Sequence, residues 1–129
     1  DLFHHDSRRF EVATSCVPLM AGLRSSLQLL DQTGSAQQRW ERIRTLSGML
    51  WQALQGLERV TPLLEVPPAS GLVSFQITGD VPPVEHVKQL GAQGLWIRDL
   101  ADPSCLRACT HITTTEDDIN ALVAAISAL

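Results

Sequence analysis

The stretch that decides the fold is residues 95–111, LWIRDLADPSCLRACTH. Two short apolar segments flank a polar turn over residues 99–104, and this pattern predicts two strands joined as a hairpin. Arg98 stands at the end of the first segment, and Arg107 lies inside the second. A hairpin would bring the two guanidinium groups to neighbouring positions.

Two arginines on adjacent apolar strands indicate a candidate anion site. A guanidinium group fits a carboxylate or a phosphate through two parallel hydrogen bonds, and an apolar strand is a costly place for an unpaired charge. The alternative is that Arg98 and Arg107 each reach solvent or pair with a nearby aspartate. The spacing alone leaves both interpretations open.

The rest of the chain predicts an α+β fold. The expected elements are a helix from Thr14 or Ser15 to Gly34, a helix over 35–57, strands over 60–66 and 73–77, a helix from Val84 to Gly91 or Gly94, the hairpin, and a helix over 115–129. Their order is ααββαββα. We expect a small, mostly antiparallel sheet of about four strands with helices on one face. Residues 1–12 show no period and are expected to run extended, before a domain over residues 13–129.

The core of this fold is predicted from helical spacing. Apolar residues recur on one face of the second helix, which is typical of a buried stripe. Its members are Trp40, Ile43, Leu46, Leu50, Leu54 and Leu57.

Composition excludes several classes of function. With 129 residues and a net charge of −4, the chain lacks the basic stripe of a general nucleic-acid binder. No apolar run is long enough to span a bilayer, so no membrane role is expected. Three cysteines, an odd number, fit a reducing cytoplasm better than a disulfide framework.

Metal sites and nucleophiles are poorly supported. His4, His5 and Asp6 are adjacent but have no further ligand at useful spacing. Cys105, Cys109 and His111 share strand parity, but a straight strand spreads them too far apart for one ion, so we expect no metal and interpret the cysteines as small buried apolar groups.

Lys88, the only lysine, is expected on the surface, because nothing around it promises the desolvation or neighbouring base that an imine-forming lysine needs. By itself the chain lacks the inventory of a complete enzyme.

Several segments, in order, resemble the C-terminal small domain of class V, fold-type I pyridoxal-phosphate enzymes, the group of cysteine desulfurases and cyst(e)ine C–S lyases. They are RFEVAT (9–14), GLVSFQI (71–77), GLWIR (94–98), CLRAC (105–109) and TTTEDDINALVAAI (113–126). The resemblance spans nearly the whole chain. Ala13 and Ser15 depart from the glycine and proline that the family has there.

The resemblance implies roles for three residues. Arg107 matches the arginine that holds the substrate α-carboxylate, and Arg98 matches a second arginine at the substrate mouth. Thr14 matches a threonine that reaches the cofactor phosphate of the partner subunit, although a plain helix N-cap would also explain it. The cofactor, pyridoxal 5′-phosphate, would be held mostly by an upstream large domain in a homodimer. That domain also carries the Schiff-base lysine, so the 129-residue chain alone is expected to be inactive.

The hairpin favours a lyase over a desulfurase. Cysteine desulfurases carry a catalytic cysteine on a loop between the two arginine strands, whereas here Cys105 falls on the strand itself. We therefore expect a C–S lyase that acts on cysteine or cystine, with no enzyme cysteine attacking the sulfur. Two alternatives stay open: a stand-alone module that binds a small carboxylate, and a class V aminotransferase or epimerase acting on another amino acid.

Overall fold

The structure is a computed structural model that describes residues 3–10 and 14–129. The chain divides into two compact units, Asp1–Ser35 and Ala36–Leu129, which are described one at a time. The first unit contains a short 3-10 helix, η1 (Ser7–Phe10), and the helix α1 (Val17–Gln32). No residue of η1 or α1 is buried.

The start of the chain is not wholly extended as predicted. The Asp6 carboxylate accepts hydrogen bonds from the backbone N–H of Arg8 (3.0 Å) and from its guanidinium group. The backbone N–H of Arg9 donates to the Asp6 carbonyl. These local bonds bend residues 7–10 into a helical turn. The same contact with Arg8 lowers the pKa of the Asp6 carboxyl group.

Helix α1 begins later than the sequence predicted. Its N-cap is Cys16, which makes no side-chain capping bond, and Pro18 lies in the first turn. Proline is tolerated there because its missing N–H would have no helical partner. Thr14 therefore lies outside the helix, and its interpretation as the N-cap is wrong.

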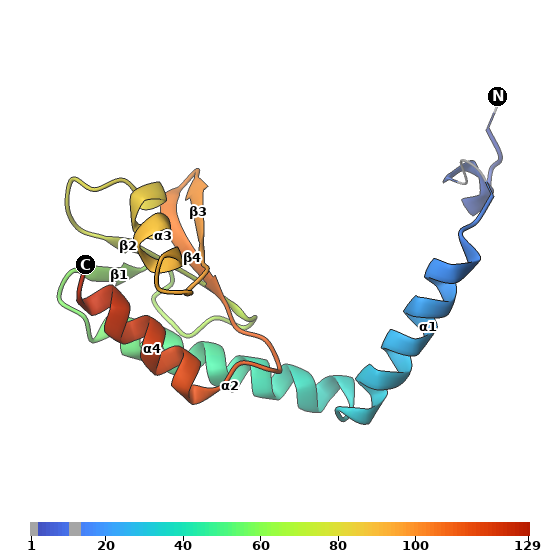
Figure 1. Cartoon of the computed structure of the whole chain (residues 1–129), viewed down its shortest axis with the longest axis horizontal. Helices are drawn as coiled ribbons and strands as arrows, with labels where there is room; N and C mark the ends of the chain where they lie inside the picture. The colour runs from blue at the N-terminus through green and yellow to red at the C-terminus, as the bar shows by residue number, and fades with distance from the viewer. Residues whose placement is uncertain (1–2, 11–13) are drawn as a thin grey trace. The chain divides into compact units, whose positions relative to one another are not determined.

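The second unit holds a four-stranded sheet and three helices (Figure 1). The elements are α2 (Ala36–Gln55), β1 (Val60–Pro62), β2 (Leu72–Ile77), α3 (Pro83–Gly91), β3 (Arg98–Ala101), β4 (Ser104–Cys109) and α4 (Glu116–Ser127). The strand order is β1-β2-β4-β3, and every neighbouring pair is antiparallel. The predicted α+β class and the order ααββαββα are confirmed.

One face of the sheet forms the core with the helices. Val73 and Phe75 of β2 stand opposite Ala108 and Leu106 of β4, and all four side chains are buried. Helix α2 contacts β1 and β2, while α3 contacts β3 and β4. Because side chains alternate along a strand, the residues between these four point to the opposite face. That face carries Ser74, Gln76, Arg107 and Cys109, which are half-buried or exposed, and also Cys105, which is buried.

The predicted stripe of α2 is confirmed at its centre. Leu46, Leu50 and Leu54 are buried, as helical spacing requires. Trp40 was wrongly expected to belong to this buried stripe: it remains 42% exposed. Its indole N–H instead donates to the carbonyl of Ala69 at 3.2 Å.

The first strand of the unit is shorter than predicted. The expected strand over residues 60–66 ends at Pro62, which has no backbone N–H to give to a ladder. One further bond, from the N–H of Leu63 to the carbonyl of Ser74, continues the pairing.

The hairpin itself is tighter than the sequence indicated. Residues 99–101, predicted as part of the turn, extend β3, and only Asp102 and Pro103 connect the strands. Leu95 does not belong to the strand, because its N–H bonds to the carbonyl of Leu90 and completes the end of α3. The pairing of Ala101 with Ser104 then closes the ladder around a two-residue turn.

Helix α4 is fixed by a reciprocal cap. The Thr115 hydroxyl accepts the N–H of Asp118, and the Asp118 carboxylate accepts the N–H of Thr115. These bonds lower the pKa of the Asp118 carboxyl group. The predicted start of the last helix at Thr115 is confirmed to within one residue.

Candidate functional site at the arginine hairpin

The two arginines of the hairpin meet in register. The Cα atoms of Arg98 and Arg107 are direct partners across β3 and β4, and Ser74 of β2 is the next partner of Arg107. Directly opposed residues of an antiparallel pair project from the same face. The face away from the helix-covered core therefore presents two guanidinium groups from neighbouring positions.

Neither guanidinium group is neutralised within the described part of the chain. Over residues 3–10 and 14–129, neither Arg98 nor Arg107 makes a hydrogen bond or ion pair through its side chain. Arg98 is exposed and Arg107 is half-buried. Of the two forms of the alternative interpretation, pairing with a nearby aspartate is not found there. The exposure of Arg98 agrees with the other form, a side chain that reaches solvent. Two adjacent cations of this kind destabilise each other unless an anion binds between them.

Cys105 lies on the same strand as Arg107 and is only 1% exposed. Burial raises the pKa of its thiol, and the nearby Arg107 charge offsets part of that rise. The expectation of a buried, apolar cysteine is thus confirmed for Cys105. For Cys109 it is wrong, since that thiol is exposed. A buried thiol with a raised pKa is a poor nucleophile.

Two other candidate residues are not part of the hairpin. Thr14 is exposed and belongs to the first unit. The Lys88 ammonium group donates to the Glu85 carboxylate at 3.0 Å, and its side chain is 67% exposed. The prediction that Lys88 is an ordinary surface lysine is confirmed.

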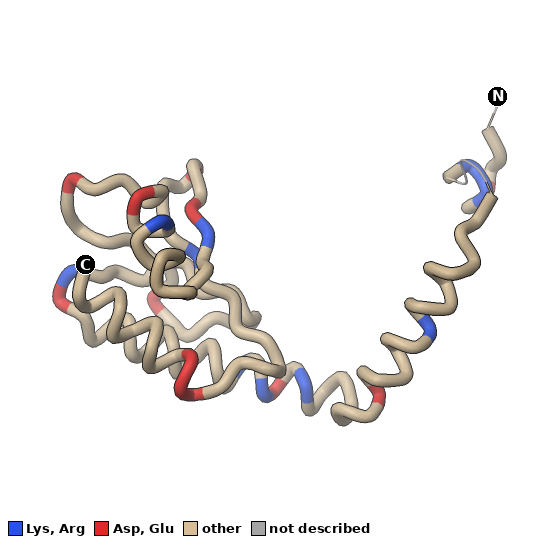
Figure 2. Tube along the Cα trace, in the orientation of Figure 1, with Lys and Arg blue, Asp and Glu red and all other residues tan. Residues whose placement is uncertain are grey.

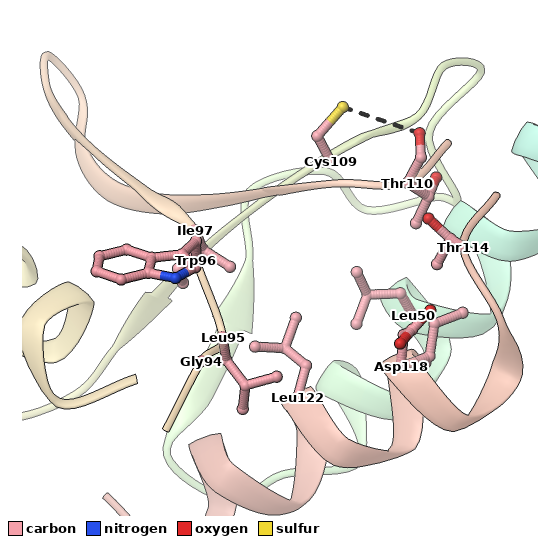
Figure 3. A pocket seen from close by; sticks show the side chains of 11 residues that line it. Leu50, Gly94, Leu95, Trp96, Ile97, Cys109, Thr110, Thr114, Asp118 and Leu122 are labelled. Atoms are coloured by element: carbon pink, nitrogen blue, oxygen red, sulfur yellow. Dashed lines mark hydrogen bonds between the residues drawn. The ribbon is translucent and has the colours of Figure 1, made fainter. Parts of the chain in front are cut away.

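A cavity of about 200 Å³, which the sequence did not predict, opens between the loop before β3, the end of β4 and α4. Leu50, Leu95 and Leu122 form its apolar part (Figure 3). Trp96 stands at its rim with its ring turned away from those leucines (Figure 3). In the sequence, the only feature that marks Trp96 is its position between two apolar residues, Leu95 and Ile97. In the structure, both of these neighbours pack against the core.

A second cavity, of about 500 Å³, lies at the opposite end of β2 and β4. His86 of α3 lines it and is only 4% exposed, and its Nδ1 has no hydrogen-bond partner among the described residues. Burial lowers the pKa of His86, the Arg59 charge adds to this effect, and Glu85 opposes it. Burial thus favours the neutral form of the imidazole.

Charge and metal-binding groups are dispersed. Acidic and basic residues are interspersed along the second unit (Figure 2). Among the residues that the structure describes, no three His, Cys, Asp or Glu side chains gather in a way that could hold a metal ion. Within that same part of the chain, no helix has both the length and the apolar character to cross a membrane.

Solved structures resemble this chain closely. It is 41% identical to the cystine C–S lyase C-DES in complex with its reaction product, cysteine persulfide, with a TM-score of 0.88 over 93% of this chain and 32% of that one. A C-DES mutant with glycine linked to the pyridoxal-phosphate cofactor aligns with a TM-score of 0.89 at the same identity, over 93% of this chain and 31% of that one.

Two further structures extend the comparison. The Escherichia coli cysteine desulfurase CsdA is 25% identical, with a TM-score of 0.78 over 92% of this chain and 31% of that one. A NifS-like protein, at 14% identity and a TM-score of 0.67, over 98% of this chain and 38% of that one, shares the fold. No family model matches the sequence, and no curated protein matches it.

The chain spans about a third of the length of the C-DES and CsdA chains that it matches. Similarity over nearly all of this chain, at 41% identity, thus bears out the resemblance seen in its motifs. The chain belongs to the cystine C–S lyase and cysteine desulfurase group of class V pyridoxal-phosphate enzymes, as the counterpart of their small C-terminal domain.

Proposed function

We propose that this chain is the substrate-gripping domain of a pyridoxal-phosphate-dependent C–S lyase that acts on cystine or cysteine. The observation that carries the proposal is the direct pairing of Arg98 with Arg107 on an open sheet face, with no acidic partner among the described residues. A pair of guanidinium groups is suited to orient an amino acid through its α-carboxylate.

The residues of this chain fit a shared site and not a complete one. Lys88 is engaged with Glu85 in solvent, so we propose that the lysine that holds the cofactor lies in an upstream large domain. That the matched lyase and desulfurase chains are about three times as long supports such a domain. Thr14, exposed and outside α1, is free of any capping role and would donate its hydroxyl to the cofactor phosphate of a partner subunit.

The chemistry that pyridoxal phosphate supplies when bound is the uptake of electrons as the Cα proton is lost and the β-sulfur departs. Arg107 would hold the substrate carboxylate, and Arg98 would add a second charge on the same face. Because both come from paired strands, the carboxylate would be held in a fixed direction. Binding of the carboxylate would also relieve the repulsion between the two cations.

Two features favour a lyase without a protein persulfide. The turn between β3 and β4 contains only Asp102 and Pro103, so it offers no cysteine. Cys105 is buried on the strand, and its thiol has a raised pKa. Sulfur would thus leave on the small-molecule product, as in the C-DES complex with cysteine persulfide. The three free cysteines support a reducing, cytoplasmic location.

The test is turnover by the full-length, cofactor-loaded enzyme. We expect cystine or cysteine to yield pyruvate together with a persulfide or sulfide, and the Cys105→Ser variant to retain that activity. Transfer of an amino group without pyruvate would instead support an aminotransferase. Loss of turnover in Cys105→Ser, with an unchanged melting temperature, would restore a desulfurase mechanism.

A second candidate, a stand-alone module that binds a small carboxylate, is favoured by one observation. The whole described core cluster lies within the second unit, so this unit has the hydrophobic interior of an independent domain. The two candidates differ in one measurement. A stand-alone module would bind alanine or acetate as tightly in the 129-residue chain as in any longer protein, whereas the lyase domain would need the rest of its enzyme.

A further inference from the structure

We propose that Trp96 is a specificity-determining residue, whose indole forms a wall against which the sulfur-bearing side chain of the substrate lies while Arg98 and Arg107 hold the carboxylate. This inference rests on the proposed function, because it assigns a role beside the same arginine pair. Trp96 would recognise the sulfur-bearing side chain of the substrate, whereas the arginines recognise its carboxylate.

The first observation is the exposure of the indole. Trp96 is 78% exposed, whereas its neighbours Leu95 and Ile97 pack against the core. The chain therefore alternates inward and outward here, and the next outward residue is Arg98. Two residues span at most about 7 Å between Cα atoms, which is within the length of an amino-acid ligand.

The second observation is that the exposed ring is held in place. A Cβ atom on Gly91 would lie 2.7 Å from Cζ3 and 3.0 Å from Cη2 of Trp96. The benzene edge of the indole thus rests on the bare backbone at the end of α3. Glycine weakens a helix by about 1 kcal/mol relative to alanine, and here it makes the room that the ring needs.

The third observation is that the loop carrying Trp96 is tightly bonded. The N–H of Gly94 donates to the Gly91 carbonyl at 2.9 Å, and the N–H of Leu95 donates to the Leu90 carbonyl at 3.0 Å. Gly94 has a φ of +80°, which a residue with a side chain rarely adopts. A large aromatic ring is therefore presented to solvent at a fixed position, as a binding site requires.

A small ligand fits this surface better than a protein partner does. The hairpin supplies no other large exposed hydrophobic residue, and Trp96 is followed by the charged Arg98, Asp99 and Arg107. Protein docking uses a contiguous apolar patch of several hundred Å². One aromatic face beside two cations instead matches an amino acid that has a carboxylate and a short sulfur-containing side chain, since sulfur makes favourable contacts with aromatic rings.

The experiment compares two ligands on the full-length, cofactor-loaded enzyme. Cystine is the substrate, and alanine, which has the carboxylate but no sulfur, is a competitive ligand. In Trp96→Ala we expect KM for cystine to rise by up to about tenfold and the inhibition constant of alanine to stay unchanged. Trp96→Phe should retain most of the affinity for cystine. Trp40→Phe, at another partly exposed tryptophan, is the matched control.

Gly91→Ala provides a second variant that keeps the indole. Its new Cβ would displace the ring, so we expect KM for cystine to rise, as in Trp96→Ala. The fraction of folded protein should stay unchanged. Equal weakening of cystine and alanine, or no effect on either, would overturn the role of Trp96. If Arg107→Lys still weakens both ligands in that case, the proposed function stands; if it also changes neither, the proposed function fails as well.

Discussion

Arg98 and Arg107 are direct cross-strand partners on β3, an edge strand, and β4, and among the described residues neither has an acidic partner. Like charges placed directly opposite one another destabilise a sheet. The pair is thus a local cost to folding that a bound carboxylate would remove. This relationship gives the most direct test of the site.

Arg107→Lys in the full-length enzyme should raise KM for its amino-acid substrate by about 10- to 100-fold, because a point charge replaces two parallel bonds to a carboxylate. Steady-state kinetics on cystine would measure the effect. Arg44→Lys is the control, since that guanidinium group lies over the Trp40 ring, 4.7 Å from its centroid. Kinetics equal to the wild type would remove Arg107 from the site.

The 129-residue chain mixed with pyridoxal phosphate should develop no stable imine absorbance, since its only lysine is paired with Glu85 in solvent. Absorbance spectra after gel filtration would measure this, with Lys88→Ala as the control. A yellow adduct that persists in the wild type and disappears in Lys88→Ala would contradict our account of this residue.

Gly71→Ala should destabilise the second unit by about 1–3 kcal/mol, as forced packing does in other cores. The new Cβ would lie 2.4 Å from the backbone oxygen of Thr110 and 2.9 Å from Cγ2 of Ile43. The N–H of Thr110 also bonds to the Gly71 carbonyl at 2.8 Å, so neither backbone segment can easily shift.

Gly48→Ala, inside α2, is the matched control for that substitution. Its Cβ would meet only Pro67 at an ordinary 3.9 Å, so a gain of up to about 1 kcal/mol is expected from helix propensity. Urea unfolding of both variants gives the two values. Equal stabilities would show that the contact between Gly71 and Thr110 is not as close as described.

His86 should make the domain less stable in mild acid. Its pKa is lowered in the folded state, so the unfolded chain takes up the proton more readily. The contribution of the neutral imidazole is complete above about pH 6.5, the ordinary value, and is lost as pH falls below it toward the folded pKa. The melting temperature should therefore fall between pH 7.5 and pH 5.5.

Replacing the imidazole tests this assignment. His86→Gln should show a smaller fall in melting temperature over the same range, while His111→Gln, at an exposed histidine, should fall like the wild type. An unchanged slope in His86→Gln would assign the pH dependence to other groups.

The sequence predicted the fold well where its pattern was periodic. The α2 stripe around Leu50 and the cap at Thr115 followed from spacing and from hydrogen-bonding chemistry. Element boundaries failed where tertiary contacts decided them. Leu95 was predicted to begin a strand, but its N–H completes the end of α3.

The site was predicted only in part for a related reason. Arg98 and Arg107 could be paired from the hairpin pattern, because register follows from a turn. Trp96 could not be identified, since its exposure depends on the glycine that seats its ring, Gly91, five residues earlier in a different element. His86 likewise carried no sequence signal, because its burial arises from strands that are distant in the chain.

All the buried hydrophobic residues among those described lie between Leu46 and Ile126. Heat absorbed on unfolding should therefore arise from the second unit alone. Calorimetry of the 129-residue chain should give an enthalpy of about 65 kcal/mol at about 60 °C, the value for a chain as long as the second unit, and not the roughly 90 kcal/mol of a fully cooperative chain of its whole length. In a scanning calorimeter, the first unit would add no measurable heat to the unfolding transition.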